Sequence, residues 1–473
     1  MIMQRHSLYI LFLFITQAFV SCDDYVDIKT EGRLYPEETE NYRYLLNQTS
    51  IYDVSYSLVD VASDDIAMTE EYAAYFENNY GTSAFYRPFK ETYKWSDSIY
   101  YAGERDSNLE VMYSGLYSAN VVITEVLESN NGTEAEKVSL QAEALVHRAY
   151  IFLNLVNIFG KAYDEGTSAT DLGIPIFTEP TVTEDITRAT VEEVYDQIIS
   201  DLQTAIEGGL PATRTGTEVG FPSLASAHAI LARTYLYMGR YEDAQAEAES
   251  ALNLQSTLLN MEDYLNTPDF GWPKRISNPE LILSKKALNS YGYAPLLLTL
   301  NDELLDTFEK NDLRYKFYTR PLSALTFNAV SDGRGYCVAR LTGESRNGGP
   351  TVGEMLLIKA EGEARSGNAE EAMASINTLR KARFTAEDYE PLTAANADEA
   401  LEKVLEERRR ELMARGGFRW FDLKRLNKET RFAKTITHPY LDKVYTLEPG
   451  DNRYQFPFAS GLFQYAPNLE QNP

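Results

Sequence analysis

The sequence "LARTYLYMGRYEDAQAEAESAL" at residues 231–252 has a second, altered copy, "IKAEGEARSGNAEEAMASINTL", at residues 358–379. In each copy an alanine lies seven residues before a glycine and another lies five residues after it; the glycines are Gly239 and Gly367. Small residues at fixed distances from a glycine let two antiparallel helices approach closely, which is the pattern of a tetratricopeptide unit. The two copies therefore predict two helical hairpins, and the long separation between them predicts large insertions.

Helical periodicity extends over most of the chain. In "VEEVYDQIISDLQTAI" at residues 191–206, apolar residues recur at spacings of three and four, and Thr190 precedes them as an expected N-cap. Similar amphipathic runs cover residues 108–128, 134–159, 222–253, 352–383 and 396–427. A third hairpin is expected at "LQAEALVHRAYIFLNLVNIFG", closed by Gly160. Because no comparably long region alternates at period two, the predicted fold class is mainly α: a tetratricopeptide-like scaffold of helical hairpins with long, loop-rich insertions.

The composition limits the classes of ligand. The chain has 473 residues, enough for two or three domains of ordinary size, and a formal net charge of -27. Such an excess of acidic residues argues against nucleic acid, because Lys and Arg supply most of the affinity for phosphate backbones. It also disfavours direct binding to an anionic lipid surface. Neutral ligands such as sugars are unaffected by this charge.

The first residues have the layout of a lipoprotein signal peptide. A polar start is followed by an apolar run, Leu8–Val20, that is short for a membrane span, and then by Ser21 and Cys22. A small residue before a cysteine resembles the lipobox of bacterial lipoproteins, although Phe19 stands where a lipobox usually has an aliphatic residue. We expect residues 1–21 to be removed and Cys22 to carry the lipid; the alternative is cleavage nearby, with Cys22 left as a buried free thiol. The acidic "DDY" that follows resembles the signal that sends lipoproteins to the cell surface in some bacteria.

The order of motifs along the chain resembles that of the SusD/RagB family of outer-membrane nutrient-binding lipoproteins. After the signal come "AEALVHRAYIFLNLVNIFG", "DLGIPIF", "TVEEVYDQIISDLQTAI", the hairpin at Gly239, "NPELIL", the hairpin at Gly367 and "ERRRELMARGGFRWFDLKRLNK" at residues 407–428. The last motif is the most specific, since nine of its residues match the family pattern: Glu407, Arg408, Arg409, Glu411, Leu412, Arg419, Trp420, Asp422 and Leu423. One departure is "MARGGF", where Arg415 precedes the glycines and the family more often has an aromatic or acidic residue.

This resemblance implies one SusD-like domain over residues 22–473, with an N-terminal part at about 22–340 and a C-terminal signature part at about 341–473. It implies a lipid-anchored protein of the cell surface that captures oligosaccharide or polysaccharide and passes it to a SusC-like TonB-dependent outer-membrane transporter. Neither a cofactor nor a catalytic step is implied. Two alternatives remain: a peptide or other nutrient binder in the same kind of transporter complex, and a periplasmic helical adaptor, since tetratricopeptide scaffolds often bind proteins.

The segment at residues 407–428 is a basic island, with eight Lys or Arg against three acidic residues. Within "ALEKVLEERRRELMARGG", glutamates lie three or four positions from Arg409, Arg410 and Arg415, which predicts intrahelical ion pairs. The glycines at 416–417 are expected to end this helix. We expect the arginines to pair with carboxylates of the acidic scaffold, so that the island marks the fold and the ligand binds elsewhere.

Two long insertions, residues 60–107 and 254–350, are rich in Tyr, Asn, Asp and Gly and poor in helical period, so we expect the ligand contacts there. Sugar rings need aromatic faces for stacking and polar side chains for their hydroxyls. The first insertion supplies Tyr72, Tyr75, Phe76, Asn78, Asn79, Tyr80, Tyr86, Arg87 and Trp95, and the second supplies Trp272, Asn289, Tyr291 and Tyr293. The alternative for each ring is that it packs its insertion onto the scaffold, as Trp95 would before a helical run. Trp272, in a turn beside glycine and proline, favours binding.

The sequence contains no catalytic or metal-binding motif. Its four His are isolated, and neither HExxH, nor GxSxG, nor a P-loop, nor EF-hand spacing occurs. With 71 Asp and Glu, chance carboxylate pairs are inevitable, so no glycosidase pair can be nominated. We expect a binding protein without enzymatic activity or cofactor; the sequence does not decide whether an acidic loop binds a calcium ion.

Overall fold

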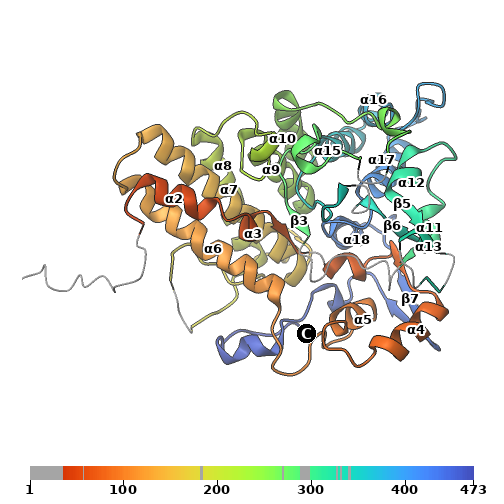
Figure 1. Ribbon diagram of the computed structural model, residues 1–473, viewed down its shortest axis with the longest axis horizontal. Helices are drawn as coiled ribbons and strands as arrows, with labels where there is room; N and C mark the ends of the chain where they lie inside the picture. The colour runs from red at the N-terminus through yellow and green to blue at the C-terminus, as the bar shows by residue number, and fades with distance from the viewer. Residues whose placement is uncertain are drawn as a thin grey trace, which may run out of the picture. The chain divides into compact units, whose positions relative to one another are not determined.

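The computed structural model describes residues 36–56, 58–181, 185–268, 271–287, 299–325, 329–330, 333–338 and 342–473. Within them, Glu38–Pro473 forms one compact unit. Helices dominate this unit and its strands are two to five residues long, which confirms the predicted fold class (Figure 1). In the described part of the chain, no helix is both long enough and apolar enough to cross a membrane.

Eight of the described helices form a scaffold in which each helix packs against the next. In chain order they are α6 (Ser107–Glu125), α7 (Glu134–Phe159), α8 (Val191–Glu207), α9 (Leu224–Met238), α10 (Tyr241–Leu254), α15 (Val352–Arg365), α16 (Ala369–Arg380) and α17 (Ala397–Leu412). They cover the amphipathic runs seen in the sequence, and the side chain of Thr190 caps α8 as expected. The third predicted hairpin is wrong: the stretch at 140–160 contains no turn and belongs to the single helix α7, which ends before Gly160 and packs between α6 and α8.

The two predicted repeats stack directly on each other. α9 and α10 form the first hairpin and α15 and α16 the second, and each turns at a glycine with positive φ, Gly239 (78°) and Gly367 (90°). α10 packs against α15 although residues 255–351 separate them in the chain. A Cβ atom at Gly362 would lie 2.7 Å from the Cβ of Gln245, so a larger residue would push the two helices apart. The second insertion therefore leaves the scaffold and returns to it without interrupting the stack.

Shorter elements surround the scaffold. They include α2 (Thr39–Leu46), α3 (Thr49–Tyr52), the 3-10 helix η2 (Leu58–Ala62), α4 (Glu70–Tyr80), α5 (Arg87–Tyr93), α11 (Asp302–Leu305), α12 (Leu313–Tyr318), α13 (Leu322–Leu325) and α18 (Phe418–Leu426). Two-stranded sheets pair β1 (Val54–Ser55) with β3 (Lys286–Ala287), β2 (Ile66–Ala67) with β4 (Thr299–Leu300), β5 (Thr319–Pro321) with β6 (Arg334–Tyr336), and β7 (Ile436–Tyr440) with β8 (Lys443–Leu447). The β1–β3 and β2–β4 pairs tie the N-terminal region to the second insertion.

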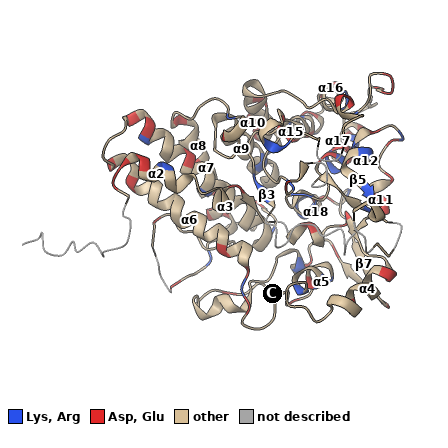
Figure 2. Ribbon diagram, in the orientation of Figure 1, with Lys and Arg blue, Asp and Glu red and all other residues tan. Residues whose placement is uncertain are grey.

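Most residues of the basic island at residues 407–428 are buried. The island forms the end of α17, a turn with positive φ at Gly416 and Gly417, and α18. Arg410 pairs with Glu406 of its own helix as expected. Figure 2 shows Lys and Arg gathered around α11, α12 and α17, whereas Asp and Glu crowd α2 and the neighbouring helix ends. The island therefore supplies internal cations to an acidic protein.

Two of the expected intrahelical pairs are not formed among the described residues. Arg409 leaves its helix to pair with acidic residues of other segments, and Arg415 donates at 3.2 Å to the main-chain carbonyl of Glu411 instead of a carboxylate. α17 also ends at Leu412, before the two glycines. Arg409 pairs outside its helix because an unpaired buried carboxylate, such as that of Asp65, costs much more free energy than an unpaired exposed one, such as that of Glu406. Other arginines of the island meet the expectation of scaffold partners: Arg408 pairs with Asp422, Arg419 with Asp64 and Arg425 with Glu361.

Lys424 joins α18 to the end of α7. Its Nζ donates to the main-chain carbonyl oxygens of Asn157 and Gly160, both at 2.6 Å, and the residue is only 5% exposed. Burial lowers the pKa of Lys424 from 10.5 to about 7. The side chain therefore becomes neutral in the folded chain at a pH where it is still charged in the unfolded chain.

We expect stability to rise with pH above neutrality because of Lys424. Below pH 7 both the folded and the unfolded chain hold the proton, and between pH 7 and 10.5 only the unfolded chain holds it, so raising the pH favours folding. The expected gain is at most about 1.4 kcal/mol per pH unit. Urea unfolding at about pH 7.5 and about pH 9 measures it, and the free energy of unfolding should rise less in Lys424→Met than in the wild type.

Lys428→Met is the matched control, because Lys428 follows the same helix end with a 38% exposed side chain. This control should keep the pH dependence of the wild type. If Lys424→Met also kept it unchanged, the assignment of the effect to Lys424 would be wrong.

Candidate functional site

The two predicted insertions meet at their bases. β2 of the first pairs with β4 of the second in antiparallel register. The main-chain nitrogen of Asn301 donates to the carbonyl oxygen of Asp65 at 2.8 Å, and that of Val330 donates to Oη of Tyr72 at 3.4 Å. Segments more than 200 residues apart in the chain, such as Asp65 and Asn301, therefore form one region of the molecule.

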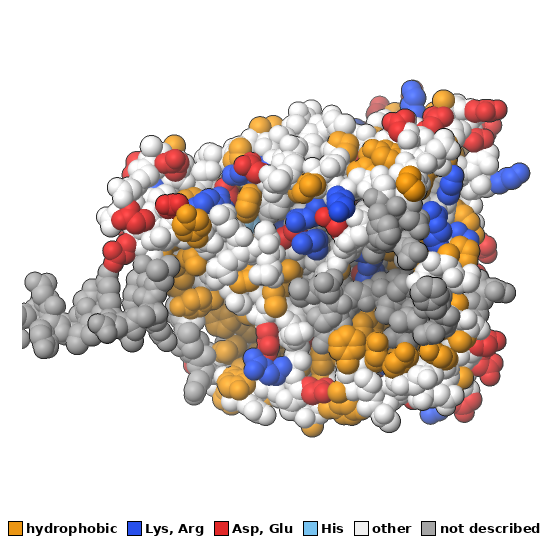
Figure 3. All heavy atoms as spheres, viewed as in Figure 1, with side chains coloured by type: hydrophobic (Ala, Val, Ile, Leu, Met, Phe, Trp, Pro, Cys, Tyr) orange, Lys and Arg blue, Asp and Glu red, His pale blue; other side chains and the backbone are white. Residues whose placement is uncertain are grey.

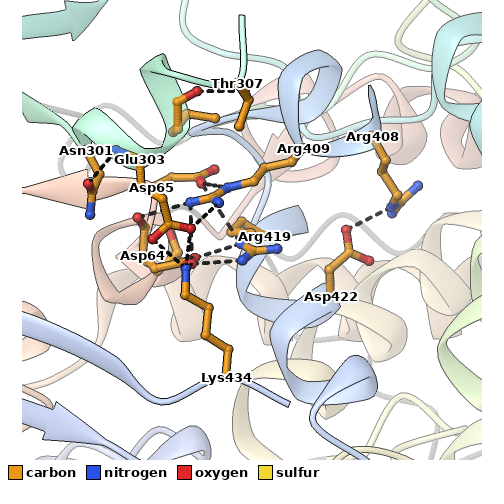
Figure 4. Close-up of polar contacts among 12 residues, drawn as sticks. Asp64, Asp65, Asn301, Glu303, Thr307, Arg408, Arg409, Arg419, Asp422 and Lys434 are labelled. Carbon is orange, nitrogen blue, oxygen red and sulfur yellow. Dashed lines mark hydrogen bonds and ion pairs between the residues drawn. The ribbon is translucent and has the colours of Figure 1, made fainter. Parts of the chain in front are cut away.

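A cluster of ion pairs fixes this junction (Figure 4). Asp64, 4% exposed, accepts from Nε and Nη2 of Arg419 at 2.6 and 2.8 Å and from Nζ of Lys434 at 2.8 Å. Glu303, in the first turn of α11, accepts from Nη1 of Arg409 at 2.9 Å and from Nζ of Lys434 at 2.7 Å. We call this group the ion cluster: Asp64, Asp65, Glu303, Arg409, Arg419 and Lys434. It connects the turn after η2 with α11, α17, α18 and the segment before β7.

The charged groups of the ion cluster neutralise one another. Burial would raise the pKa of Asp64, but Arg419 and Arg409 outweigh burial and hold that pKa well below its usual range. Burial dominates at Asp65 and raises its pKa, although Nε of Arg409 lies 2.8 Å from one of its oxygens. With three cations facing three carboxyl groups, the cluster offers little charge to a ligand. Its role is to position the insertions.

A row of rings, the aromatic ledge, lies on the first insertion. It consists of Tyr75 and Tyr80 of α4 and of Phe85 and Tyr86 in the turn before α5. The ring centroids lie 6.2 Å apart for Tyr75 and Tyr80, 4.7 Å for Tyr80 and Tyr86, and 4.9 Å for Phe85 and Tyr86. Phe85 is 57% exposed and the other three are partly buried. Figure 3 shows hydrophobic side chains at the surface in the area of α5 and β7, at the lower right of the view.

Polar groups border the aromatic ledge. Asn78 and Asn79 are exposed on α4. The guanidinium of Arg87 lies 4.3 Å from the ring centroid of Tyr101 and donates to the carbonyl oxygen of Ser98 at 3.3 Å. Rings and hydrogen-bonding groups of the kind that a sugar needs are therefore adjacent on this surface.

Three rings of the predicted site pack in the core. Tyr72 is 0% exposed and Phe76 1% exposed. Trp95 is 5% exposed, its Nε1 donates to the carbonyl oxygen of Ala62 at 3.0 Å, and its ring stacks on His438 with 4.2 Å between centroids. These three residues hold α4 and α5 on the scaffold, and in this conformation they present no free ring face to a ligand.

Trp272 also packs internally. It is 5% exposed, and its ring centroid lies 5.1 Å from that of Tyr264 and 4.7 Å from that of Phe317. Its remaining exposure faces a small cavity. The other predicted members of the second insertion, Asn289, Tyr291 and Tyr293, lie outside the described residues, as does the predicted lipidation residue Cys22.

The predicted set omitted two exposed rings, Phe85 and Tyr101, which are 57% and 40% exposed. A signal for Phe85 existed in the sequence: Pro88 follows it closely, and proline is common in the first turn of a helix, so Phe85 falls in the turn before α5. Tyr101 had no such signal, because its proximity to Arg87 depends on the tertiary fold. In the described residues, no group of three or more His, Cys, Asp or Glu could hold a metal ion.

Two family models match the chain. One, described as "Starch-binding associating with outer membrane", matches residues 24–236, and the other, described as the SusD family, matches residues 349–473. The first match contains the aromatic ledge and the second contains the basic island. Together they leave mainly the second insertion unmatched.

The curated relatives include two proteins of Formosa agariphila. SusD-like protein P2 is 27% identical over 348 residues, which are 63% of this chain and 66% of that protein. SusD-like protein P38 is 24% identical over 400 residues, which are 70% of this chain and 74% of that protein. The chain thus spans about two thirds to three quarters of the length of these relatives.

Solved structures share the fold along nearly the whole chain. A SusD superfamily protein from Bacteroides thetaiotaomicron has a TM-score of 0.69 at 20% identity, covering 92% of this chain and all of that one. A putative sugar binding protein from Bacteroides vulgatus has a TM-score of 0.68 at 20% identity, covering 93% and 99%. A laminarin binding SusD-like protein has a TM-score of 0.60 at 20% identity, covering 93% and 100%. At this identity the likeness establishes the fold.

Proposed function

Because the chain belongs to the SusD/RagB family, we propose that it is a cell-surface lipoprotein that binds an oligosaccharide or polysaccharide and delivers it to a partner TonB-dependent outer-membrane transporter. The family description that matches its N-terminal part concerns starch binding and association with the outer membrane. One protein of the same fold binds laminarin. Both facts concern relatives, and they favour a glycan as the class of ligand for this chain.

The single observation that carries the glycan assignment is the aromatic ledge. Its rings are partly exposed while Tyr72 and Phe76 of the same insertion are buried beneath them, so the outer rings have a fixed base. Sugar rings have apolar faces that stack on aromatic rings, and Asn78 and Arg87 supply hydrogen bonds to hydroxyls. The β2–β4 pair and the ion cluster join the second insertion to this base. Its residues Asn289, Tyr291 and Tyr293 stay predicted ligand contacts from the sequence.

The test of this function is a binding screen on purified protein lacking residues 1–21. Neutral polysaccharides, acidic polysaccharides and peptide mixtures are compared by affinity gel electrophoresis and isothermal titration calorimetry. Saturable binding to at least one polysaccharide is expected. Binding to peptides without binding to any polysaccharide would replace the glycan assignment with the peptide alternative.

Anchoring and the transporter partner need separate tests. Cys22→Ser is expected to release the protein from the membrane fraction, and protease added to intact cells is expected to degrade the wild type. Protection of the wild type from that protease would favour the periplasmic adaptor. Co-purification from outer membranes should recover a TonB-dependent transporter, and its absence from wild-type preparations would count against the delivery step.

A further inference from the structure

A small cavity separates the second insertion from the turn between α17 and α18. Its volume is about 80 Å³, the share of liquid occupied by two or three water molecules. The walls include the rings of Trp272, Tyr318 and Tyr336 together with Thr342, Glu344 and Arg415. The cavity thus combines aromatic walls with charged side chains. No residue of the aromatic ledge lines it.

The acidic residues of this cavity are already engaged. Glu280 accepts from Nη2 of Arg383 at 2.8 Å. Glu344 accepts from the main-chain nitrogen of Arg275 at 2.8 Å and lies 3.6 Å from Nε of that residue. Arg275 itself pairs with Asp53. Three of the four charged residues that line the cavity therefore have a charged partner.

Arg415 is the fourth. Among the described residues it has no carboxylate within ion-pair distance, and its hydrogen bond goes from Nη2 to the main-chain carbonyl of Glu411 at 3.2 Å. A guanidinium has five N–H donors, so most of the donors of Arg415 make no hydrogen bond to the described residues. Arg415 is partly buried, and burial alone would lower its pKa, but Tyr336, Tyr318 and the carboxylate of Glu411 outweigh burial and raise this pKa above its usual value, so the side chain stays cationic.

The contrast with the neighbouring arginines is informative. Arg408, Arg409, Arg410 and Arg419 each have a carboxylate within 3.5 Å. A cavity wall that carries a cation without a carboxylate partner among the described residues indicates an anionic group as the ligand of the cavity.

We propose that the Arg415 cavity receives the carboxylate of an acidic sugar. The guanidinium offers parallel N–H donors that match the two oxygens of a carboxylate, and such charge-assisted pairs are about twice as strong as neutral hydrogen bonds. The volume accommodates the carboxylate and adjoining atoms, and the aromatic walls of Trp272 and Tyr336 exclude water around them. The inference rests on the proposed glycan binding and names the class of glycan: one that contains uronic acid residues.

The experiment compares D-glucuronate, D-glucose, acetate and phosphate by calorimetric titration of the protein lacking residues 1–21. Glucuronate is expected to bind at least about tenfold more tightly than glucose. Arg415→Gln should remove that preference, and Arg415→Lys should keep part of it, because a point charge remains without the paired donors. Equal affinity for acetate and glucuronate would support the carboxylate site and assign it to small carboxylates in general. A preference for phosphate over both carboxylates would overturn the proposal.

Two controls separate this inference from loss of folding and from the proposed function. Arg431→Gln changes an arginine with a 37% exposed side chain that is already paired with Asp398 and Glu402, so it should leave the preference unchanged. Thermal unfolding should give similar midpoints for all variants. Equal binding of acidic and neutral glycans by the wild type would refute the Arg415 site while leaving glycan binding intact. Absence of binding to every glycan would instead refute the proposed function.

Discussion

Glu411→Gln is expected to lower the free energy of unfolding by about 3–5 kcal/mol, the cost of removing one partner from a buried ion pair. Glu411 is 1% exposed and accepts from Nε and Nη2 of Arg383, both at 2.9 Å, and from Nη1 of Arg314 at 3.1 Å. Both guanidinium groups are 0% exposed. Gln keeps the shape of the side chain but removes the charge, so two buried cations lose a counter-ion without the creation of a cavity.

The effect is large because Glu411 joins separate segments. Arg314 lies in the first turn of α12 in the second insertion, and Arg383 follows α16. Glu280, inside the second insertion, also accepts from Arg383. Although burial alone would raise the pKa of Glu411, Arg383 and Arg314 hold this pKa below its usual value, which shows that the charged form is the one the fold stabilises.

Glu406→Gln is the matched control on the same helix. Glu406 has a 52% exposed side chain and pairs with Arg410, so its loss should cost about 0–1 kcal/mol. Urea unfolding of the wild type and both variants measures the difference. Equal destabilisation by the two substitutions would contradict the view that burial, and not charge alone, makes Glu411 important.

The helices of the scaffold could be predicted because their signals are local. Apolar spacing of three and four residues, the N-cap Thr190, and turns at Gly239 and Gly367 all act within a few positions of each other. The stacking of α10 on α15 had no such signal, since it requires residues 255–351 to leave and return. Gly362 is compatible with close packing of two helices, but the sequence does not indicate that α10 is the helix it packs against.

The ion cluster could be predicted only in part. The excess of acidic residues predicted that arginines of the basic island would form ion pairs with carboxylates, and most of them do. Which carboxylates they found depended on the fold: Arg409 pairs with Asp64 and Asp65, which lie more than 340 residues away in the chain. Local helical spacing suggested Glu partners because it contains no information about these long-range neighbours.

The candidate site was predictable as a region and less so by residue. Composition pointed to both insertions and the turn context favoured Trp272 of the second, whereas the aromatic ledge lies on the first. The buried rings Tyr72 and Phe76 are four positions apart, the spacing of one helix face, but Tyr75 lies three positions after Tyr72 and Tyr80 lies four after Phe76, which are spacings of the same kind. Assigning α4 as a helix would therefore not have separated the buried rings from the outer ones. The burial of Trp272 likewise depends on tertiary packing, against Phe317 of α12, and follows from no local pattern.

The double variant Phe85→Ala/Tyr86→Ala is expected to weaken binding of the glycan identified in the screen by about 2–3 kcal/mol, roughly 30- to 150-fold in affinity. Phe85 is the most exposed ring of the aromatic ledge, and its centroid lies 4.9 Å from that of Tyr86. A sugar that stacks on these rings covers apolar area from both, so removing both rings removes most of that stacking. Calorimetric titration with the wild type and the variant measures the change.

Controls must separate lost stacking from a disturbed fold, because Tyr86 also contacts Phe76 in the core. Phe85→Ala alone changes a ring that is 57% exposed, so it should leave the thermal unfolding midpoint near that of the wild type while still reducing affinity by roughly tenfold. Tyr117→Ala removes a ring of α6 that is 46% exposed, and affinity should not change. Full affinity in the double variant would move the binding site away from the aromatic ledge. An equal loss in Tyr117→Ala would mean that the ledge has no special part in binding.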